Sequence, residues 1–201
     1  MKPSPILQRS LCFLLFSLLF NCSYAASPLY YQVEIIGFTI ADNGSIVSNE
    51  QFPAYPALPE FNNVVDLKPY EEDALDPTYM LLPKARLKLN RESNLIGKKE
   101  RYDILFHMGW LQKPGEEHKV RIFGASPNEQ RPIELNGTIK IKKGYYYVVD
   151  FNFDLYPLNQ ARGKLNSHYI LATQRKLKSL ELNYIDHPKF GILMEIFPIE
   201  K

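Results

Sequence analysis

The sequence predicts an α+β protein that is mostly antiparallel β-sheet, with about one helix. Two observations lead to this fold class. Several segments alternate apolar and polar side chains, which is the period of a strand with one buried face. The links between successive segments are short, which favours antiparallel neighbours over parallel βαβ units. We therefore expect a meander-like sheet, a sandwich or an open barrel.

The first expected strand covers residues 30–40, where Tyr31, Val33 and Ile35 alternate with polar side chains. Further strands are expected at residues 102–111, 119–123, 138–142, 145–155 and 168–172. Turn signals separate some of them, namely residues 113–116, Asn136-Gly137 and Lys143-Gly144. In the segment 145–155 one face is expected to be apolar, formed by Tyr147, Val149, Phe151, Phe153 and Leu155.

One helix is expected between two irregular regions. Residues 41–80 contain several prolines and little periodicity, which predicts a long surface excursion. Pro83 is a residue that can start a helix, and Gly97 is one that can end it. The apolar residues Leu82, Ala85, Leu89 and Ile96 follow one stripe at helical spacing.

The C-terminal segment predicts two strands joined by a turn. Leu180, Leu182 and Tyr184 alternate with polar residues, and residues 192–196 resume the alternation. Asp186, His187 and Pro188 interrupt it. We expect this triplet to be a structural turn in which Asp186 accepts backbone N–H groups, Pro188 sets the direction and His187 binds no metal.

The N-terminus predicts export. Residues 1–25 have the pattern of a cleaved signal peptide, with Lys2 and Arg9 before an apolar run and a small-x-small site that ends at Ala25. A lipoprotein anchor at Cys22 is disfavoured, because bulky and polar residues precede it. We expect a periplasmic protein in which residues 26–201 form a single domain without a membrane span.

The composition of the exported chain excludes several classes of function. Both cysteines, Cys12 and Cys22, lie in the signal peptide, so disulfides and cysteine chemistry are not expected. The full chain has 24 basic and 22 acidic residues, and the signal peptide removes two basic ones, which leaves a formally neutral protein. Nucleic-acid-binding domains are usually strongly basic, so we expect no nucleic-acid partner.

No catalytic pattern is present in the sequence. The spacings Ser-x-x-Lys, Gly-x-Ser-x-Gly and His-Glu-x-x-His are absent, and the histidines are scattered. Glu181, Asp186 and Glu195 could supply the two carboxylates of a glycosidase, but their spacing singles out no pair. The sequence therefore predicts no enzyme, no catalytic residue, no metal and no cofactor.

Four segments in a fixed order resemble the CsiV family of periplasmic peptidoglycan-binding proteins. They are residues 31–38, residues 102–112 with the pattern His-x-x-Trp-x-Gln, residues 135–147 with the run Tyr-Tyr-Tyr, and residues 181–193 with Asp-His-Pro-x-Phe-Gly-Ile-Leu. Gly37 departs from the aliphatic residue expected there, and the first loop lacks a tryptophan-proline pair. The resemblance implies peptidoglycan binding and support of cell-wall synthesis, including activation of a bifunctional penicillin-binding protein through its lipoprotein activator.

A glycan site needs aromatic faces for stacking and charged groups for carboxylates and hydroxyls. The candidate binding residues are therefore Trp110, Tyr146, Arg175, Lys176, Lys178 and Glu181. Structural roles are the alternative for several of them. Trp110 at a strand end is typical of a core residue. The basic residues could instead keep an edge strand soluble. Two other functions stay open, a protein-interaction adaptor without glycan affinity and a cryptic wall hydrolase.

Overall fold

The computed structural model describes residues 30–40, 59–126, 132–157 and 168–199. The predicted signal peptide and residues 41–58 of the predicted excursion lie outside these ranges. Within residues 59–80 the chain is mainly irregular, as predicted, with one short strand and isolated bridges to neighbouring segments.

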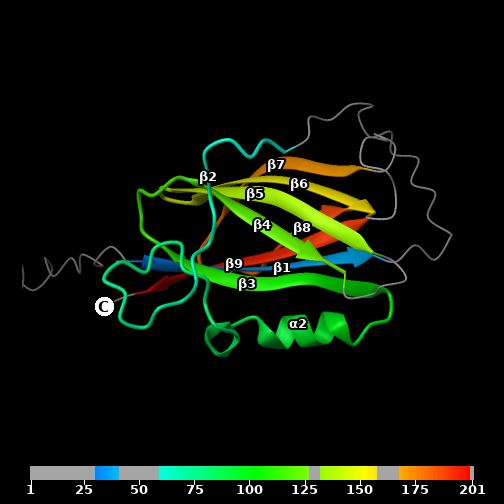
Figure 1. Cartoon of the computed structure of the whole chain (residues 1–201), viewed down its shortest axis with the longest axis horizontal. Helices are drawn as coiled ribbons and strands as arrows, with labels where there is room; N and C mark the ends of the chain where they lie inside the picture. The colour runs from blue at the N-terminus through cyan, green and yellow to red at the C-terminus, as the bar shows by residue number, and fades with distance from the viewer. Residues whose placement is uncertain (1–29, 41–58, 127–131, 158–167, 200–201) are drawn as a thin grey trace, which may run out of the picture.

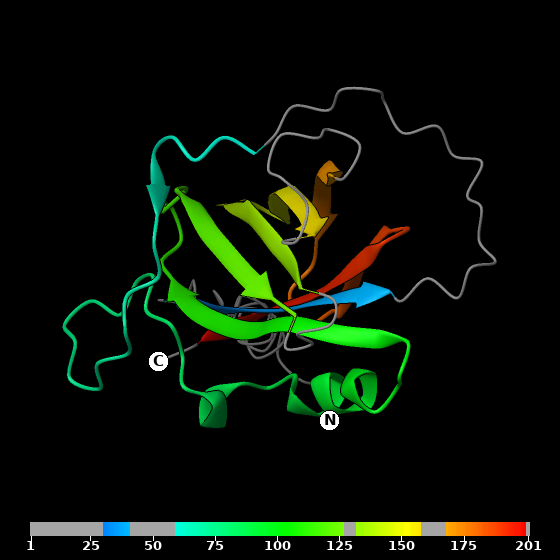
Figure 2. The same cartoon turned by 45° about the vertical axis from the view of Figure 1, so that its right-hand side comes forward.

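Two sheets make up the described fold (Figures 1 and 2). The four-stranded sheet has the order β3 (Tyr102–Gln112), β1 (Tyr30–Ile40), β9 (Phe190–Ile199) and β8 (Asn183–His187). The five-stranded sheet has the order β2 (Val64–Val65), β4 (Lys119–Ala125), β5 (Ile133–Lys143), β6 (Tyr147–Pro157) and β7 (Tyr169–Leu177). Strand pairs are antiparallel except β2 with β4. The predicted fold class is confirmed.

The main core lies between the two sheets. The inner faces of β1 and β9 contribute Val33, Ile35 and Met194, and those of β5 and β6 contribute Ile139 and Phe151. Each of these side chains is almost completely buried. Alternation along each strand places every second residue in this core, which is why the apolar period in the sequence locates the strands correctly.

The outer face of the four-stranded sheet is also covered, so β1 is buried on both sides. Helix α2 (Asn90–Gly97) lies against this face, on the side away from the five-stranded sheet (Figure 1). Its Ile96 packs with Leu89 of the preceding segment against Ile36 and Phe197. A single helix beginning at Pro83 is wrong: a 3-10 turn at Lys84–Arg86 and an extended Leu87 come before α2.

The turn predicted at Asn136-Gly137 is also wrong, because both residues lie inside β5. A Cβ on Gly137 would stand 2.4 Å from the backbone oxygen of Asn152 on β6. Glycine is needed here for close strand approach rather than for a reversal. The turn predicted at Lys143-Gly144 is confirmed, since it joins β5 to β6.

The C-terminal pair of strands exists, but its first strand starts later than predicted. Leu180 and Leu182 precede β8, and Tyr184 in β8 points outward with 52% of its surface exposed. The inward residues of β8 are Ile185 and His187 instead. The alternation misleads because residues 178–182 carry the chain from one sheet to the other. In β9 the predicted inward residues Ile192, Met194 and Ile196 are confirmed as core.

Candidate functional site

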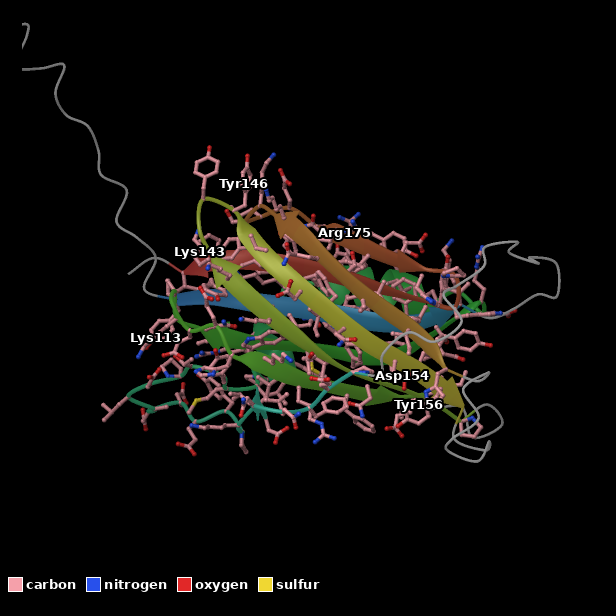
Figure 3. All side chains as sticks on the ribbon, turned by 90° about the horizontal axis from the view of Figure 1, so that it is seen from above. Lys113, Lys143, Tyr146, Asp154, Tyr156 and Arg175 are labelled. Atoms are coloured by element: carbon pink, nitrogen blue, oxygen red, sulfur yellow. The ribbon has the colours of Figure 1, made fainter. Side chains whose placement is uncertain are left out.

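The structure brings several of the predicted residues together at one end of the five-stranded sheet. Tyr147 at the start of β6 pairs with Leu177 at the end of β7, so the β5–β6 turn lies beside the segment that follows β7. Figure 3 shows Tyr146 at this end. The exposed residues of the two segments form what we call the hairpin-end surface: Tyr145, Tyr146, Lys178, Leu180, Glu181 and Leu182.

Two tyrosine rings stand at the tip of the β5–β6 hairpin. A hydrogen bond from Gly144 N to Tyr146 O, 2.9 Å long, holds the turn. Tyr145 is 91% exposed and Tyr146 38%, and their rings meet edge to face with centroids 4.8 Å apart. Such exposed faces contribute little to folding and are available to stack on sugars. Sequence reasoning selects Tyr146 and misses Tyr145, although its position directly after a Lys-Gly turn is a signal of exposure.

A lysine and a glutamate lie beside these rings. Lys178 Nζ is 3.2 Å from Glu181 Oε1, and both side chains are exposed. The hydrogen bond to Glu181 raises the pKa of Lys178, and the nearby Tyr146 and Tyr145 raise it further. The hairpin-end surface therefore offers a cation, an anion and two aromatic faces to one ligand.

The predicted basic run does not form a single patch. On β7 Arg175 pairs with Val149, a core residue of β6, whereas Lys176 pairs with Val148. Neighbouring residues of a strand point to opposite faces, so Arg175 and Lys176 project to different sides of the sheet. Arg175 is exposed because β7 is an edge strand (Figure 3). Of the three predicted cations, Lys178 alone belongs to the hairpin-end surface.

Leu180 has an unusual backbone for its residue type. Its φ is +60°, a left-handed conformation that favours glycine, and its side chain is 66% exposed. Its N–H donates to the carbonyl of Ile196, 2.9 Å away, which fixes the crossing between the sheets. A strained backbone that presents an exposed apolar side chain is a feature found at binding surfaces.

Trp110 is buried and is therefore not part of the candidate surface. The side chain is completely buried in the core between the sheets, so its ring has no face to offer a sugar. Its Nε1–H donates to Gln112 Oε1 at 3.1 Å, and Gln112 Nε2 donates to the carbonyl of Glu116 at 2.5 Å. The platform role predicted for Trp110 is wrong, and the simpler core reading is correct.

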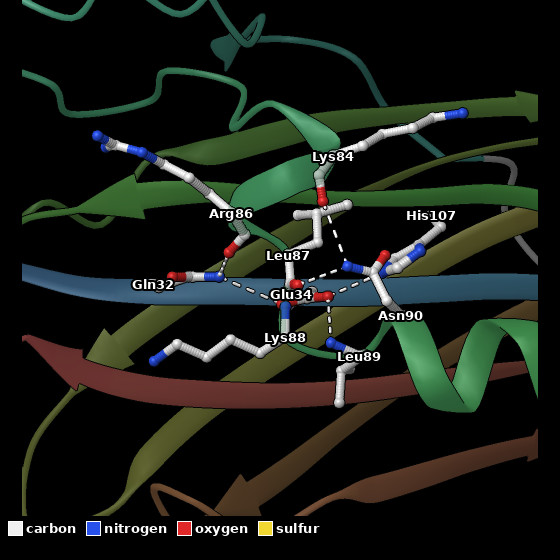
Figure 4. A network of polar contacts seen from close by, with 9 residues as sticks. All are labelled: Gln32, Glu34, Lys84, Arg86, Leu87, Lys88, Leu89, Asn90 and His107. Atoms are coloured by element: carbon white, nitrogen blue, oxygen red, sulfur yellow. Dashed lines mark hydrogen bonds and ion pairs between the residues drawn. The ribbon is translucent and has the colours of Figure 1, made fainter.

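Glu34 is a completely buried carboxylate at the centre of a polar network beside the N-terminal end of α2 (Figure 4). Its two oxygens accept the backbone N–H groups of Lys88 and Leu89, each at 2.7 Å. His107 Nε2 lies 2.7 Å from Oε1, and Gln32 Nε2 donates to Oε2 at 3.2 Å. The carboxylate supplies the cap that the helix lacks locally, so the role of this network is structural. The alternation of β1 in the sequence places Glu34 on a solvent face and therefore misses it.

Asp186 and His187 are the last two residues of β8, and Pro188 with Lys189 forms the β8–β9 turn, so both the position of the turn and its contacts differ from the prediction. Asp186 is exposed and accepts a hydrogen bond from the hydroxyl of Tyr184 at 2.7 Å, not from backbone. The backbone N–H of Lys189 donates to His187 Nδ1 at 3.2 Å. His187 is buried against the ring of Phe190, and burial lowers its pKa to about 4. The capping role belongs to the neutral imidazole.

The carboxylates considered for hydrolysis do not gather. Glu181 pairs with Lys178, Asp186 with Tyr184, and Glu195 lies on the outer face of β9 opposite Glu34. Across the ranges that the structure describes, no group of three or more histidine, cysteine, aspartate and glutamate side chains is placed to hold a metal ion. A search of the same ranges for helices found none with the length and apolar character needed to cross a membrane.

Comparison with known protein families identifies the family of this chain. The model of a family described as "Peptidoglycan-binding protein, CsiV" matches residues 9–199. The chain belongs to the CsiV family. The match covers nearly the whole chain and confirms the resemblance found in the sequence. The comparison with curated proteins and the comparison with solved structures gave no match.

The segments that carry the CsiV resemblance fall into two groups in the structure. The opening strand and the His-x-x-Trp-x-Gln pattern are buried, where they form the Glu34 network and the core around Trp110. The tyrosine run reaches the surface at Tyr145 and Tyr146. Much of the CsiV pattern thus describes the fold, and its exposed residues include Tyr145 and Tyr146 of the hairpin-end surface as well as Tyr184 and Asp186 of β8.

Proposed function

We propose that this CsiV-family protein is a non-catalytic peptidoglycan-binding protein whose hairpin-end surface contacts the glycan strand. The observation that carries the proposal is the exposed Tyr145–Tyr146 ring pair with Lys178 beside it. Aromatic rings stack on the apolar faces of sugars, and a lysine attracts the carboxylates of the stem peptides. The family description, peptidoglycan-binding, supports this use of the surface.

The proposal extends to location and role. The protein is exported by the signal peptide of residues 1–25 and works in the periplasm, where peptidoglycan lies. It supports wall synthesis by contacting the lipoprotein activator of a bifunctional penicillin-binding protein. Leu180 and Leu182, which are 66% and 46% exposed beside the tyrosines, support a protein contact, because exposed leucines at one surface favour a protein partner.

Co-sedimentation of the purified protein with sacculi tests the glycan contact. The wild type should pellet with sacculi, and the double variant Tyr145→Ala/Tyr146→Ala should bind about tenfold more weakly, since each ring contact contributes roughly 0.5–1.5 kcal/mol. Tyr184→Ala is the matched control, because Tyr184 is 52% exposed but lies on the other sheet. Equal binding by the double variant and the wild type would remove the hairpin-end surface from the proposal.

The same assay separates the other functions. A wild-type protein that stays in the supernatant while it binds the lipoprotein activator would be an adaptor, and soluble muropeptides released during incubation would indicate a hydrolase. For the protein contact, Leu180→Gly removes the side chain and suits the positive φ of this position. This variant should fold normally and bind the activator more weakly, whereas Leu75→Gly, at another exposed leucine, should not change binding.

A further inference from the structure

The outer face of the five-stranded sheet carries a group of cations that are far apart in the sequence. The register places Lys119 opposite Lys140, and Lys142 and Lys176 both opposite Val148. Arg121 lies two residues after Lys119 and therefore on the same face. We call these five residues the basic face: Lys119, Arg121, Lys140, Lys142 and Lys176.

The basic face is accessible and carries an excess of positive charge, because its five cations surround one carboxylate, that of Asp150 opposite Lys140. Arg121, Lys142 and Lys176 are exposed, and Lys119 and Lys140 are half-buried. None of the five forms an ion pair with a residue of the described ranges. Lys119 and Lys140 stand directly opposite each other, an arrangement of like charges that destabilises a sheet. An arrangement of like charges that carries such a cost favours an anionic ligand.

Two acidic residues of β6, Asp150 and Asp154, lie on the same face of the sheet, and only Asp150 is close to the cations. Asp150 stands directly opposite Lys140 and offsets part of the positive charge, while its Oδ1 accepts a hydrogen bond from Gln174 Nε2 at 2.6 Å. Asp154 lies at the far end of the sheet from Tyr146, as Figure 3 shows, and its Oδ2 is 2.7 Å from His168 Nδ1. The face is therefore polarised, with its positive half adjoining the hairpin-end surface.

The dimensions of the basic face suit an extended chain with several carboxylates. Neighbouring strands are about 4.8 Å apart and alternate residues about 6.8 Å apart, so the cations cover roughly 14 Å from β4 to β7. Uncharged sugar hydroxyls have no need of five cations, whereas the peptide stems of peptidoglycan carry free carboxylates. Lys176 on this face is two residues from Lys178 of the hairpin-end surface, so the two surfaces are continuous.

We propose that the basic face binds the carboxylates of peptidoglycan stem peptides while the hairpin-end surface holds the glycan strand. This inference rests on the proposed function and adds the part of the polymer that a second surface recognises. Because the contacts are charge–charge interactions at an exposed face, binding through the basic face weakens as the ionic strength rises.

The test is the triple variant Lys140→Gln/Lys142→Gln/Lys176→Gln, assayed with intact sacculi and with sacculi whose stem carboxylates have been converted to amides, which removes the charge and keeps the cross-linked network. On intact sacculi at low salt the triple variant should bind about tenfold more weakly than the wild type, and the difference should shrink at high salt. On amidated sacculi the two proteins should bind equally. The melting temperature of each variant checks that it folds.

Two control variants test whether the loss of binding comes from the charges of the basic face. Lys84→Gln/Lys98→Gln/Lys99→Gln removes the same charge from exposed positions near α2 and should bind like the wild type. Replacing Lys140, Lys142 and Lys176 by arginine keeps the charge and should preserve binding.

The outcomes separate the two proposals. No binding of wild type to intact sacculi would overturn the proposed function. Wild-type binding that the glutamine triple variant retains would overturn the basic face alone. An equal loss in the triple variant near α2 would show that net charge, not this face, is responsible. A difference between wild type and triple variant that persists on amidated sacculi would exclude the stem carboxylates as the ligand.

Discussion

Replacement of Glu34 by glutamine should destabilise the protein strongly without touching either proposed binding surface. The carboxylate is completely buried and accepts the N–H groups of Lys88 and Leu89, each at 2.7 Å. Glutamine has nearly the same shape, but one of its oxygens is replaced by an NH₂ group, which is a donor. In Glu34→Gln one backbone N–H therefore faces another donor instead of an acceptor, whichever way the amide turns.

The size of the effect follows from these contacts. A hydrogen bond to a charged group contributes about 1.5–3 kcal/mol, and the variant loses one such bond outright. The second bond changes from charged to neutral, which costs roughly another 1 kcal/mol. The expected loss is about 2.5–4 kcal/mol, a large part of the 5–15 kcal/mol that typically stabilises a domain. Helix α2 should fray first, because the carboxylate caps it.

The matched control is Glu195→Gln on the neighbouring strand. Glu195 stands directly opposite Glu34 on the same face, and burial, with the negative charges of Glu92 and Glu34, raises its pKa. Its charge is therefore disfavoured in the fold, so neutralising it should leave stability unchanged or raise it slightly. Urea unfolding followed by circular dichroism measures both variants. A loss below about 1 kcal/mol for Glu34→Gln, or equal losses in the two variants, would refute the capping role.

Two further predictions concern stability. The pKa of His187 is about 4 in the fold and about 6.5 when unfolded, so the unfolded state takes up its proton first as the pH falls. The free energy of unfolding should therefore drop by up to about 3 kcal/mol between pH 6.5 and pH 4, and His187→Gln should lack this part of the drop in urea midpoints measured across that range. Gly137→Ala should cost about 1–3 kcal/mol, because the new Cβ would meet the backbone oxygen of Asn152. Gly144→Ala, where the nearest atom is 3.6 Å away, is its control in thermal melting, and equal melting points would contradict the packing argument.

Local patterns in the sequence predict those parts of the fold where one face of a strand meets the core. The bounds of the first strand, residues 30–40, coincide with those of β1. The five apolar residues expected on one face of the segment 145–155 are all buried in the core. These predictions succeed because burial of one face repeats every two residues, and that period is visible in the chain itself.

The same patterns mislead where tertiary contacts override them. The stripe from Leu82 to Ile96 has helical spacing, but Glu34 takes the N–H groups of Lys88 and Leu89 from outside, and the helix begins only at Asn90. At Gly137 the glycine led to the prediction of a turn. Glycine also occurs where two strands approach closely, and that is its role here.

In the candidate site, too, the sequence predicts some residues correctly and others wrongly. Tyr146, Lys178 and Glu181 are predicted from residue type and do come together, whereas Trp110 is buried and Arg175 turns to the other side of its strand. Residue type indicates what chemistry a side chain can perform. It does not indicate whether the folded chain leaves that side chain exposed.

The sequence by itself determined the strand-rich fold class, most strand positions and the CsiV family, because these depend on local alternation and on ordered motifs. Only the tertiary structure decided which face each charged residue occupies. Lys119, Lys140 and Lys176 are brought to one surface by the pairing of four strands, and that register depends on how the apolar faces meet in the core. A shift by one residue would send every one of these charges to the opposite face, so no local pattern could have assembled the basic face.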